Sequence, residues 1–279
     1  MRVSLEHKRH DAGSGPARAA WIEALQKAGH EVCPDGDVVI AVGGDGTITR
    51  AAHRIAGEPR PLLVVPQGTA NNLAHGLGLE PPAAPLAYAL DVLAAPRPRR
   101  LDVGLAEGAF GVRTFYEGAG VGLFADALAE VLSEEDKHPL LAARRLADFL
   151  DRHAPPELAV TLDGEDASGR YTLVEVMNVG MLGPNLQLGG DADPSDGLFD
   201  VVLIGADAVA DLRGYLEHKA AGGQDRPPRF RCHRAHDVRV SVGGNPLRLD
   251  GEVVRRTGRK GANARFSMRR GALEVWLPA

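Results

Sequence analysis

The chain has few cysteines, few aromatic residues and no long apolar run. Its only two cysteines, Cys33 and Cys232, lie far apart and have no metal-ligating partners at motif spacing, which makes a reducing compartment the simpler expectation. No apolar stretch approaches the ~20 residues that a membrane helix needs. The first residues do not read as a signal peptide. We therefore expect a soluble, cytoplasmic protein.

The ten histidines also lack a metal-binding spacing such as H-E-x-x-H. What the chain has in excess is glycine, with 34 of 279 residues, well above the usual share of ~7%. This suits a protein with many turns, and 44% hydrophobic residues are enough to build a good core. Composition thus allows two globular domains but decides little about function.

A glycine-rich turn follows directly on an apolar run at residues 38–42, which reads as a buried strand. The turn consists of Gly43, Gly44, Asp45, Gly46 and Thr47, and a helix is expected from residue 48. Glycines let backbone N–H groups approach an anion, and a helix start adds the positive end of its dipole. Asp45 would repel a phosphate unless a nucleotide-bound Mg²⁺ lay between them. The alternative is a tight connection whose aspartate caps the helix.

A second apolar run, residues 61–65, ends in the turn Pro66-Gln67-Gly68-Thr69-Ala70-Asn71-Asn72 and again leads into a helix. Two successive turns of this kind would lie at neighbouring carboxyl ends of a parallel sheet, where open α/β sheets bind their ligands. We expect them to define one cleft.

The first hundred residues alternate between strand and helix patterns, and the rest is mostly strand. Strands are expected at residues 3–5, 38–42 and 61–65, and helices at 16–29, 49–56, 71–77 and 85–93. After a Pro- and Arg-rich boundary at 96–100, strands are expected at 101–105, 111–117, 158–162, 171–178 and 198–204, with short strands over 235–277. Helices are expected at 123–132, 140–153 and 208–221, the first two joined by a polar link at 133–136.

The predicted architecture is an α/β nucleotide-binding domain with a parallel sheet, residues 1–100, followed by a mostly antiparallel β domain, residues 101–279. The active site is expected in the cleft between them.

GGDGT, followed about twenty residues later by P-x-G-T-x-N, resembles the catalytic domain of the diacylglycerol kinase and sphingosine kinase family, the ATP-dependent lipid kinases, and in particular its bacterial lipid kinases. FYEGAGVG at residues 115–122, the stretch DADPSDGLFD ending at Asp200, and LDGE at 249–252 follow in the order of that family. The resemblance therefore covers about the whole chain. NAD kinases and phosphofructokinases resemble this family in carrying a similar GGDGT, but the combination of motifs is more specific.

The resemblance implies ATP and Mg²⁺ as cofactors and assigns roles to the motif residues. The nucleotide-binding residues would be Gly43, Gly44, Asp45, Gly46, Thr47, Gly68, Thr69 and Asn71. Asp45 would join the Mg²⁺ network, and its role as cation holder or base differs between members of the family. Glu252 would accept the proton of the substrate hydroxyl, with Asp250 as its partner on the same face of a strand. The alternative for Asp250 is an exposed Asp-Gly hairpin turn.

Asp193, Asp196 and the carbonyl of Leu198 would hold a structural Mg²⁺ distant from ATP, as the resemblance implies. The alternative is a Pro-initiated turn with aspartate caps.

Charge is distributed unevenly along the chain, whose net charge is −5. The segment from Arg226 to Arg270 holds thirteen Lys or Arg against three acids, hence +10, which leaves −15 for the remainder. Such asymmetry suggests an anionic partner. Nucleic acid is not expected, because the segment lacks interleaved aromatics. An anionic membrane surface suits a lipid kinase and predicts peripheral membrane association. The alternative is that these cations lie on ordinary solvated strand faces.

Lipid kinases that resemble this chain include dimers, so the oligomeric state is open and a homodimer is possible.

The chain also departs from the family. The usual N-P-x-S-G loop is reduced to residues 11–15, and residues 29–37 leave little room for the strand and helix usual before GGDGT. Thr49 and Arg50 replace an Asn-Glu pair, and Asn72 stands where many members have Asp.

Three hypotheses for the function follow. The first is a kinase of a lipid hydroxyl, diacylglycerol before sphingoid bases, ceramide or phosphatidylglycerol. The others are an NAD kinase-like enzyme and a degenerate nucleotide- or lipid-binding regulator.

Overall fold

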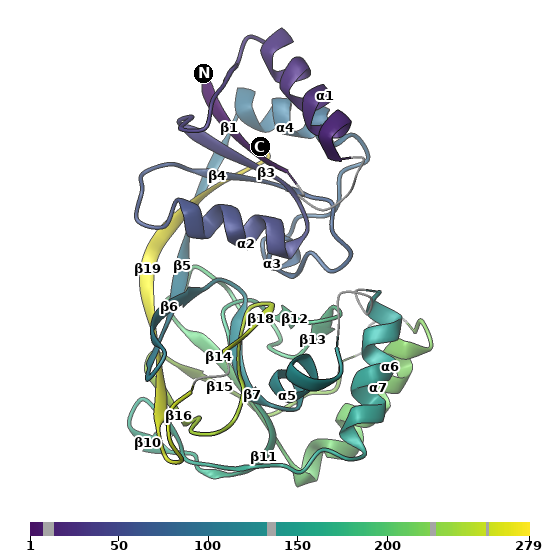
Figure 1. Ribbon diagram of the computed structural model, residues 1–279, viewed down its shortest axis with the longest axis vertical. Helices are drawn as coiled ribbons and strands as arrows, with labels where there is room; N and C mark the ends of the chain where they lie inside the picture. The colour runs from purple at the N-terminus through teal and green to yellow at the C-terminus, as the bar shows by residue number, and fades with distance from the viewer. Residues whose placement is uncertain (8–13, 133–137, 224–226, 255–256) are drawn as a thin grey trace. The chain divides into compact units, whose positions relative to one another are not determined.

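The computed structural model describes residues 1–7, 14–132, 138–223, 227–254 and 257–279, and it divides into two compact units. Unit 1 comprises Met1–Leu101 and Arg270–Ala279, and unit 2 comprises Asp102–Arg269. Residues 270–279, assigned above to the second domain, thus pack in unit 1. The chain passes between the units through β5 (Arg97–Gly108) and β19 (Asn263–Leu277) (Figure 1). The predicted polar link at 133–136, most of the loop at 11–15, and three arginines at positions 226, 255 and 256 lie outside the described residues.

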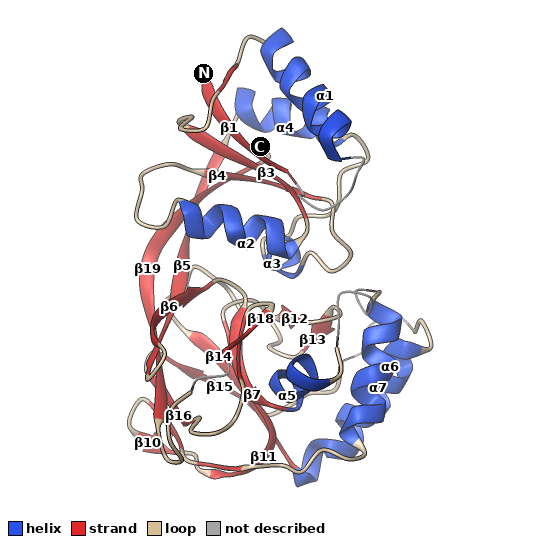
Figure 2. Ribbon diagram, viewed as in Figure 1, coloured by secondary structure: helices blue, strands red, loops and turns tan. Residues whose placement is uncertain are grey.

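Unit 1 is a parallel sheet covered by helices on both faces (Figure 2). Its strands are β1 (Arg2–His7), β2 (Glu31–Val32), β3 (Val38–Gly43), β4 (Leu62–Pro66) and the end of β19, in the order β2-β1-β3-β4-β19. Its helices are α1 (Ser14–Lys27), α2 (Asp45–Arg54), α3 (Asn72–Gly76) and α4 (Pro85–Ala94). Helices α1 and α4 lie on one side of the sheet, and α2 and α3 lie on the other (Figure 1). The predicted α/β domain is confirmed.

The apolar run of β3 is buried on both faces. Val38, Ile40 and Val42 belong to the core that includes residues of α1 and α4, and Val39 and Ala41 point to the opposite face and are also buried. A strand covered on both faces has no polar alternation, which is why the sequence shows a continuous run. Two details differ from the expectation. The helix after β3 begins at Asp45, with Gly44 as its N-cap. The short stretch before β3 keeps a two-residue strand, β2, parallel to β1.

Unit 2 is a β-sandwich flanked by helices. One sheet contains β7 (Gly118–Gly122), β11 (Gly169–Met177), β14 (Phe199–Gly205), β15 (Cys232–Ala235), β17 (Leu247–Leu249) and β18 (Glu252–Val254), in the antiparallel order β15-β14-β11-β7-β17-β18. The other contains β9 (Val160–Leu162), β10 (Glu165–Asp166), β16 (Val238–Ser241), β6 (Gly111–Phe115) and parts of β5 and β19. A short strand, β8 (Glu157–Leu158), pairs with β11 of the first sheet, and β12 (Met181–Leu182) and β13 (Leu186–Gln187) pair with each other. The mostly antiparallel β domain is confirmed.

Side-chain alternation divides unit 2 into two cores. On β14, Phe199, Val201 and Leu203 join the core between the sheets, whereas Val202 and Ile204 face the helices. Those helices are α5 (Leu123–Glu130), α6 (Pro139–Leu150) and α7 (Val209–Ala220), preceded by the 3₁₀ turn η2 (Ala206–Ala208). The tail contains short strands as expected, but β19 is a single strand of 15 residues. No helix in the described ranges is long and apolar enough to cross a membrane.

Candidate functional site

The two glycine-rich turns of unit 1 pack directly against each other. They follow β3 and β4, which are neighbouring parallel strands, so both turns lie at the same end of the sheet. A Cβ atom on Gly68 would lie 2.3 Å from the Cα of Gly44, and one on Gly44 would lie 2.8 Å from the Cα of Gly68. Nonbonded carbons stay about 3.5–4.0 Å apart, so only glycine fits both positions. The expected adjacency of the two motifs is confirmed.

Asp45 links the two turns. It is the first residue of α2, and its carboxylate accepts a hydrogen bond from the backbone N–H of Leu73 in α3 at 3.3 Å. Burial raises the pKa of this carboxyl group, and the backbone N–H groups of Leu73 and Asn71 oppose the rise. Asp45 therefore lies inside its own helix rather than at its N-cap, and its carboxylate braces the start of the neighbouring helix.

Asn71 shapes the second turn from inside. It is the N-cap of α3 and adopts the left-handed conformation, with φ of 54°. Its side-chain oxygen accepts a hydrogen bond from the Gly68 N–H, and its side-chain amide donates to the Gly68 carbonyl, both at 2.8 Å. Because Asn71 is buried, these bonds fix the loop backbone. Thr47 is buried as well, whereas Gly46 and Thr69 are exposed.

Three departures from the family pattern lie at the two turns. Thr49 donates its hydroxyl to the backbone carbonyl of Asp45 at 2.9 Å. Arg50 is exposed, and its guanidinium donates to the hydroxyl of Thr47 at 3.4 Å. Asn72 is buried at the start of α3. A guanidinium thus stands beside the glycine turn where the family carries an acid.

In unit 2, Asp250 is held by the backbone of the FYEGAG segment. Its carboxylate accepts hydrogen bonds from the N–H groups of Tyr116, Glu117 and Gly118, at distances between 2.8 and 3.2 Å. Burial raises the pKa of Asp250, and these N–H groups together with Arg248 oppose the rise. The Asp250 N–H in turn donates to the Gly118 carbonyl at 2.8 Å. A buried carboxylate with this many donors is a structural clamp.

Asp250 and Gly251 form the two-residue turn between β17 and β18. Leu249 pairs with Glu252 across this turn, and Asp250 has a positive φ of 49°. Asp250 is buried, whereas Glu252 is exposed. The expectation that both carboxylates share one face of a strand is wrong, because alternation holds along a strand and the chain reverses here. The hairpin alternative had the turn right but not the exposure of Asp250. The role of Glu252 as proton acceptor stays a prediction.

A buried ion pair next to this turn escaped the sequence analysis. Arg248 donates to a carboxylate oxygen of Glu175 at 2.6 Å and to the backbone carbonyl of Asp250, also at 2.6 Å. Glu175 is fully buried and Arg248 is 4% exposed. Burial raises the pKa of Glu175, which the guanidinium opposes. The sequence signal for this pair was a charged residue in the middle of each of two apolar strand patterns. Glu175 lies within Leu173 to Met177, and Arg248 lies within Leu247 to Leu249.

The predicted metal turn is occupied by its own hydrogen bonds. The carboxylate of Asp193 accepts from the N–H of Ser195, and that of Asp196 accepts from the N–H of Leu198, both at 2.9 Å. The second oxygen of Asp196 pairs with the guanidinium of Arg234. Among the described residues, no group of three or more His, Cys, Asp or Glu side chains is arranged to hold a metal. The hydrogen bonds from Ser195 and Leu198 match the aspartate-cap alternative. A cation here would have to compete with Arg234.

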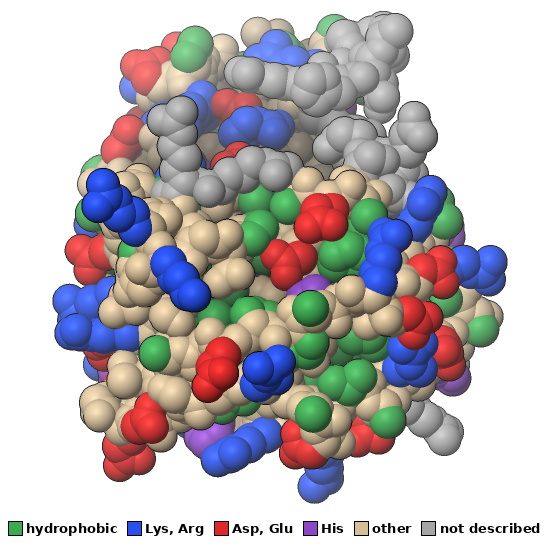
Figure 3. Space-filling model, turned by 60° about the horizontal axis from the view of Figure 1, so that its bottom comes forward, with side chains coloured by type: hydrophobic (Ala, Val, Ile, Leu, Met, Phe, Trp, Pro, Cys, Tyr) green, Lys and Arg blue, Asp and Glu red, His purple; other side chains and the backbone are tan. Residues whose placement is uncertain are grey.

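The basic segment is partly neutralised by acids from distant parts of the chain. The face in Figure 3 shows Lys and Arg side chains scattered among Asp and Glu rather than gathered in one patch. Net charge along the sequence therefore overstates the local positive field. The ion pairs with acids outside the segment are Arg234–Asp196, Arg265–Glu107 and Arg248–Glu175. Within the segment, Arg239 and Arg265 also pair with Asp237, which the net charge of +10 already includes.

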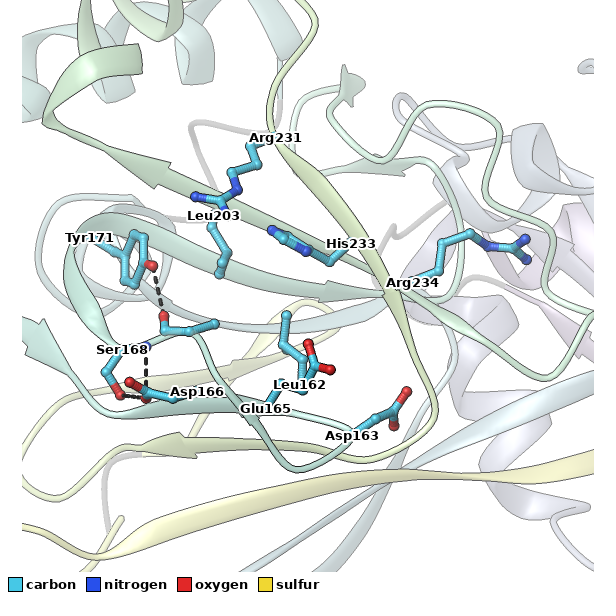
Figure 4. A pocket seen from close by; sticks show the side chains of 11 residues that line it. Leu162, Asp163, Glu165, Asp166, Ser168, Tyr171, Leu203, Arg231, His233 and Arg234 are labelled. Carbon is cyan, nitrogen blue, oxygen red and sulfur yellow. Dashed lines mark hydrogen bonds between the residues drawn. The ribbon is translucent and has the colours of Figure 1, made fainter.

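A cavity of about 550 Å³ opens between the β9–β10 hairpin and β15, and it contains none of the predicted site residues (Figure 4). Several of its polar groups already bond within the protein. The Tyr171 hydroxyl donates to the Ala167 carbonyl at 2.7 Å, and Ser168 bonds Asp166. The carboxylate of Asp163 accepts two backbone N–H groups. The predicted site residues therefore lie elsewhere, at the turns described above.

Comparison with known proteins agrees with these motifs. A family model described as the diacylglycerol kinase catalytic domain matches residues 9–106, and one described as the YegS C-terminal NAD kinase beta sandwich-like domain matches residues 119–276. A probable YegS-like lipid kinase of Pseudomonas fluorescens (strain Pf-5) is 30% identical over 289 residues, which cover 100% of this chain and 90% of that protein. The diacylglycerol kinase of Bacillus subtilis (strain 168) is 27% identical and covers 82% of this chain and 76% of its own.

A crystal structure of a diacylglycerol kinase from Bacillus anthracis str. Sterne has the same fold, with a TM-score of 0.73 over 98% of this chain and 95% of that one, at 16% identity. The two family models together match most of both units and include the GGDGT, PQGTANN, PSDGLFD and LDGE motifs. The chain therefore belongs to the lipid kinase family of the diacylglycerol kinases and YegS-like proteins.

Proposed function

We propose that this protein is an ATP- and Mg²⁺-dependent kinase that transfers the γ-phosphate of ATP to the hydroxyl of a diacylglycerol-like lipid. The observation that carries the proposal is the packing of Gly44 against Gly68, which places two glycine turns and two helix starts at one end of the sheet. Backbone N–H groups in such turns suit the phosphates of a nucleotide. The names of the relatives, lipid kinase and diacylglycerol kinase, support a lipid acceptor.

The first turn fits a phosphate chain in its shape. A Cβ on Gly46 would meet no atom within 4 Å, so the exposed backbone there borders open space. Asp45 is the carboxylate of this part of unit 1 that would hold a magnesium ion, and such an ion would neutralise phosphate charge. Asp45 also connects the two turns, because its carboxylate accepts a hydrogen bond from the backbone N–H of Leu73. Its substitution should therefore impair both the geometry and the cation.

Arg50 supports nucleotide binding despite the missing family acids. Its guanidinium is exposed and hydrogen-bonds Thr47 in the first turn. A guanidinium forms strong bidentate contacts with phosphate oxygens. In this chain, a direct cation contact takes over part of the neutralisation for which the family uses a carboxylate and a metal.

Glu252 is the proposed proton acceptor. It is exposed beside the clamped Asp250, so its carboxylate can reach a substrate while its backbone is anchored. Phosphoryl transfer depends mainly on positioning and charge neutralisation, and a carboxylate that takes the hydroxyl proton completes the set. Asp250, buried and bonded to three N–H groups, acts as the anchor in this proposal rather than as a second base.

The protein would act in the cytoplasm and meet its lipid at the membrane surface through exposed cations of the segment between Arg226 and Arg270. Nucleic acid is not a proposed partner, and a homodimer remains a prediction. Binding to vesicles that contain anionic phospholipid, measured by sedimentation, should fall as ionic strength rises. Binding that is independent of both salt and anionic lipid would argue against this route.

Two other functions have an observation in their favour. The family model that matches unit 2 is described as NAD kinase beta sandwich-like, which keeps NAD among the acceptors to be tested. Asn72, which stands where many members of the family have Asp, and the short stretch before β3 favour a nucleotide-binding regulator without turnover. Both alternatives predict ATP binding, so only the acceptor distinguishes them from the lipid kinase.

A single assay separates the three functions. Transfer of labelled γ-phosphate is measured with liposomes that contain diacylglycerol, a sphingoid base, ceramide or phosphatidylglycerol, and with NAD in one parallel reaction. Product from a lipid supports the proposal, and product from NAD alone would replace it with the second function. ATP binding without any product favours the regulator.

The site is tested with Glu252→Gln in the same assay. This variant should lose turnover by at least about 100-fold, the usual contribution of a general base, and should bind ATP as the wild type does. Glu165→Gln, at an exposed position of β10, is the matched control and should keep full turnover. Near-normal turnover of Glu252→Gln would refute its role as base.

A further inference from the structure

The buried ion pair of unit 2 lies in one row across three strands. In the register of this sheet, Gly120 of β7 pairs with Glu175 of β11 on one side and with Arg248 of β17 on the other. Residues in neighbouring strands at such positions point to the same face. Glu175 and Arg248 are thus two strands apart, and the missing side chain of Gly120 leaves the space in which they meet.

Gly120 is required for this arrangement. A Cβ at this position would lie 2.1–2.2 Å from the three atoms of the Glu175 carboxylate group. The guanidinium of Arg248 bonds Glu175 with one nitrogen and the backbone carbonyl of Asp250 with another. That carbonyl belongs to the residue immediately before Gly251-Glu252. The rigid centre of the sheet is therefore connected to the turn that carries Glu252.

We infer that Arg248, held by Glu175 across Gly120, is a positioning residue that sets the backbone of the Asp250-Gly251 turn and thereby the place of Glu252. This inference rests on the proposed function, because it assigns Glu252 as the proton acceptor. The planar guanidinium suits the task, since its fork makes two directed bonds at once, which a lysine ammonium on a flexible stem does not fix in the same way.

The competing explanation is an ion pair that serves the fold alone. The two explanations differ when both charges are removed together. A buried ion pair replaced by apolar residues of similar size often leaves stability unchanged or increases it, whereas removal of one partner leaves an uncompensated charge. The double variant Glu175→Met/Arg248→Met therefore removes the link to the turn without leaving a buried charge.

The experiment compares the wild type with this double variant in two measurements. The first is amide hydrogen exchange of residues 250–253 in the full chain without substrate, which we expect to become about tenfold faster, because an anchor of the turn is lost. The second is lipid phosphorylation, in which kcat should fall by about 10- to 100-fold, in line with the cost of a small misplacement of a reacting group. The KM for ATP should stay within about twofold, because the proposed nucleotide site belongs to unit 1.

The control is Asp151→Asn/Arg213→Gln, which removes an ion pair between residues at α6 and α7 in the same unit. Both measurements should keep their wild-type values in this variant. Arg248→Lys restores a positive charge next to Glu175. It should regain the melting temperature that Arg248→Met loses, but not the kcat that Arg248→Met loses.

The outcomes are distinct. Unchanged exchange in residues 250–253, or unchanged kcat despite faster exchange, would overturn the positioning role and leave the proposed function intact. Full recovery of kcat by Arg248→Lys would overturn the need for a two-point guanidinium contact. A wild type that phosphorylates no lipid would refute the proposed function and with it the catalytic part of the inference, while the exchange measurement still decides whether Arg248 anchors the turn.

Discussion

The closest backbone approach of the candidate site gives the sharpest prediction. In Gly68→Ala, the new Cβ would lie 2.3 Å from the Cα of Gly44 and 2.7 Å from the side-chain oxygen of Asn71. Nonbonded carbons require about 3.5–4.0 Å, so the two turns must separate by more than ~1 Å. Overpacking of this kind costs about 1–3 kcal/mol. A displacement of ~1 Å in a positioning element also costs turnover on the order of 100-fold.

The stability part can be read in unit 1 alone. The chain has two tryptophans, and both Trp21 and Trp276 pack in the core of unit 1. Urea unfolding followed by tryptophan fluorescence therefore reports on this unit. With a slope of about 1–3 kcal/mol per molar urea, the midpoint of Gly68→Ala should fall by about 1 M, and the affinity for ATP, measured by calorimetry, should fall with it.

The control is Gly214→Ala in α7. A Cβ there would meet no atom within 4 Å, and alanine in a helix interior is favoured over glycine by about 0.5–1 kcal/mol. This variant should not lower the midpoint or weaken ATP binding. A Gly68→Ala protein with the midpoint and ATP affinity of the wild type would refute the packing of the two turns on which the site is built.

Three further predictions concern single side chains. Arg50→Ala should raise the KM for ATP by about tenfold, consistent with the loss of a charged hydrogen bond, with the free energy of unfolding within about 0.5 kcal/mol of the wild type; an unchanged KM would exclude a phosphate contact. Asp196→Ala should lower the melting temperature equally with and without Mg²⁺ if the turn is capped as described, whereas a loss only in Mg²⁺ would favour the metal site. In Asp237, burial raises the pKa, but the bonds from Arg265 and Arg239 outweigh this and hold it below its usual 3.8. The stabilisation is therefore present above pH ~3.8 and lost as pH falls through the folded pKa. Asp237→Asn should lose up to about 1 kcal/mol at pH 7, and its urea midpoint should approach that of the wild type at low pH.

Local patterns predicted most elements of the fold correctly. The buried run of β3 and the glycine turn after it follow from a continuous apolar stretch and a break in it, both of which are properties of neighbouring residues. Element ends were predicted less accurately. Helix α2, expected from residue 48, begins at Asp45, because Gly44 serves as its N-cap. The long strand β19 and its place in both units depend on partners distant in sequence, β4 and β16.

The candidate site divides in the same way. Gly44, Gly68 and Glu252 could be named from motifs, since the spacing of residues in a turn is encoded locally. That Asp45 braces α3, and that the carboxylate of Asp250 is clamped by Tyr116, Glu117 and Gly118, could not be read from any motif.

By itself the sequence determined the family, through the resemblance of its motifs. It also determined the α/β and β halves and the two glycine turns, because periodicity and turn composition are short-range properties of the chain. Only the tertiary structure decided which charges meet. Arg248 finds Glu175, 73 positions away, because strand register aligns both with Gly120, and the basic segment loses part of its charge to Asp196 and Glu107. Burial and partner choice depend on how distant strands pair, and that pairing sets the free energy of every buried charge.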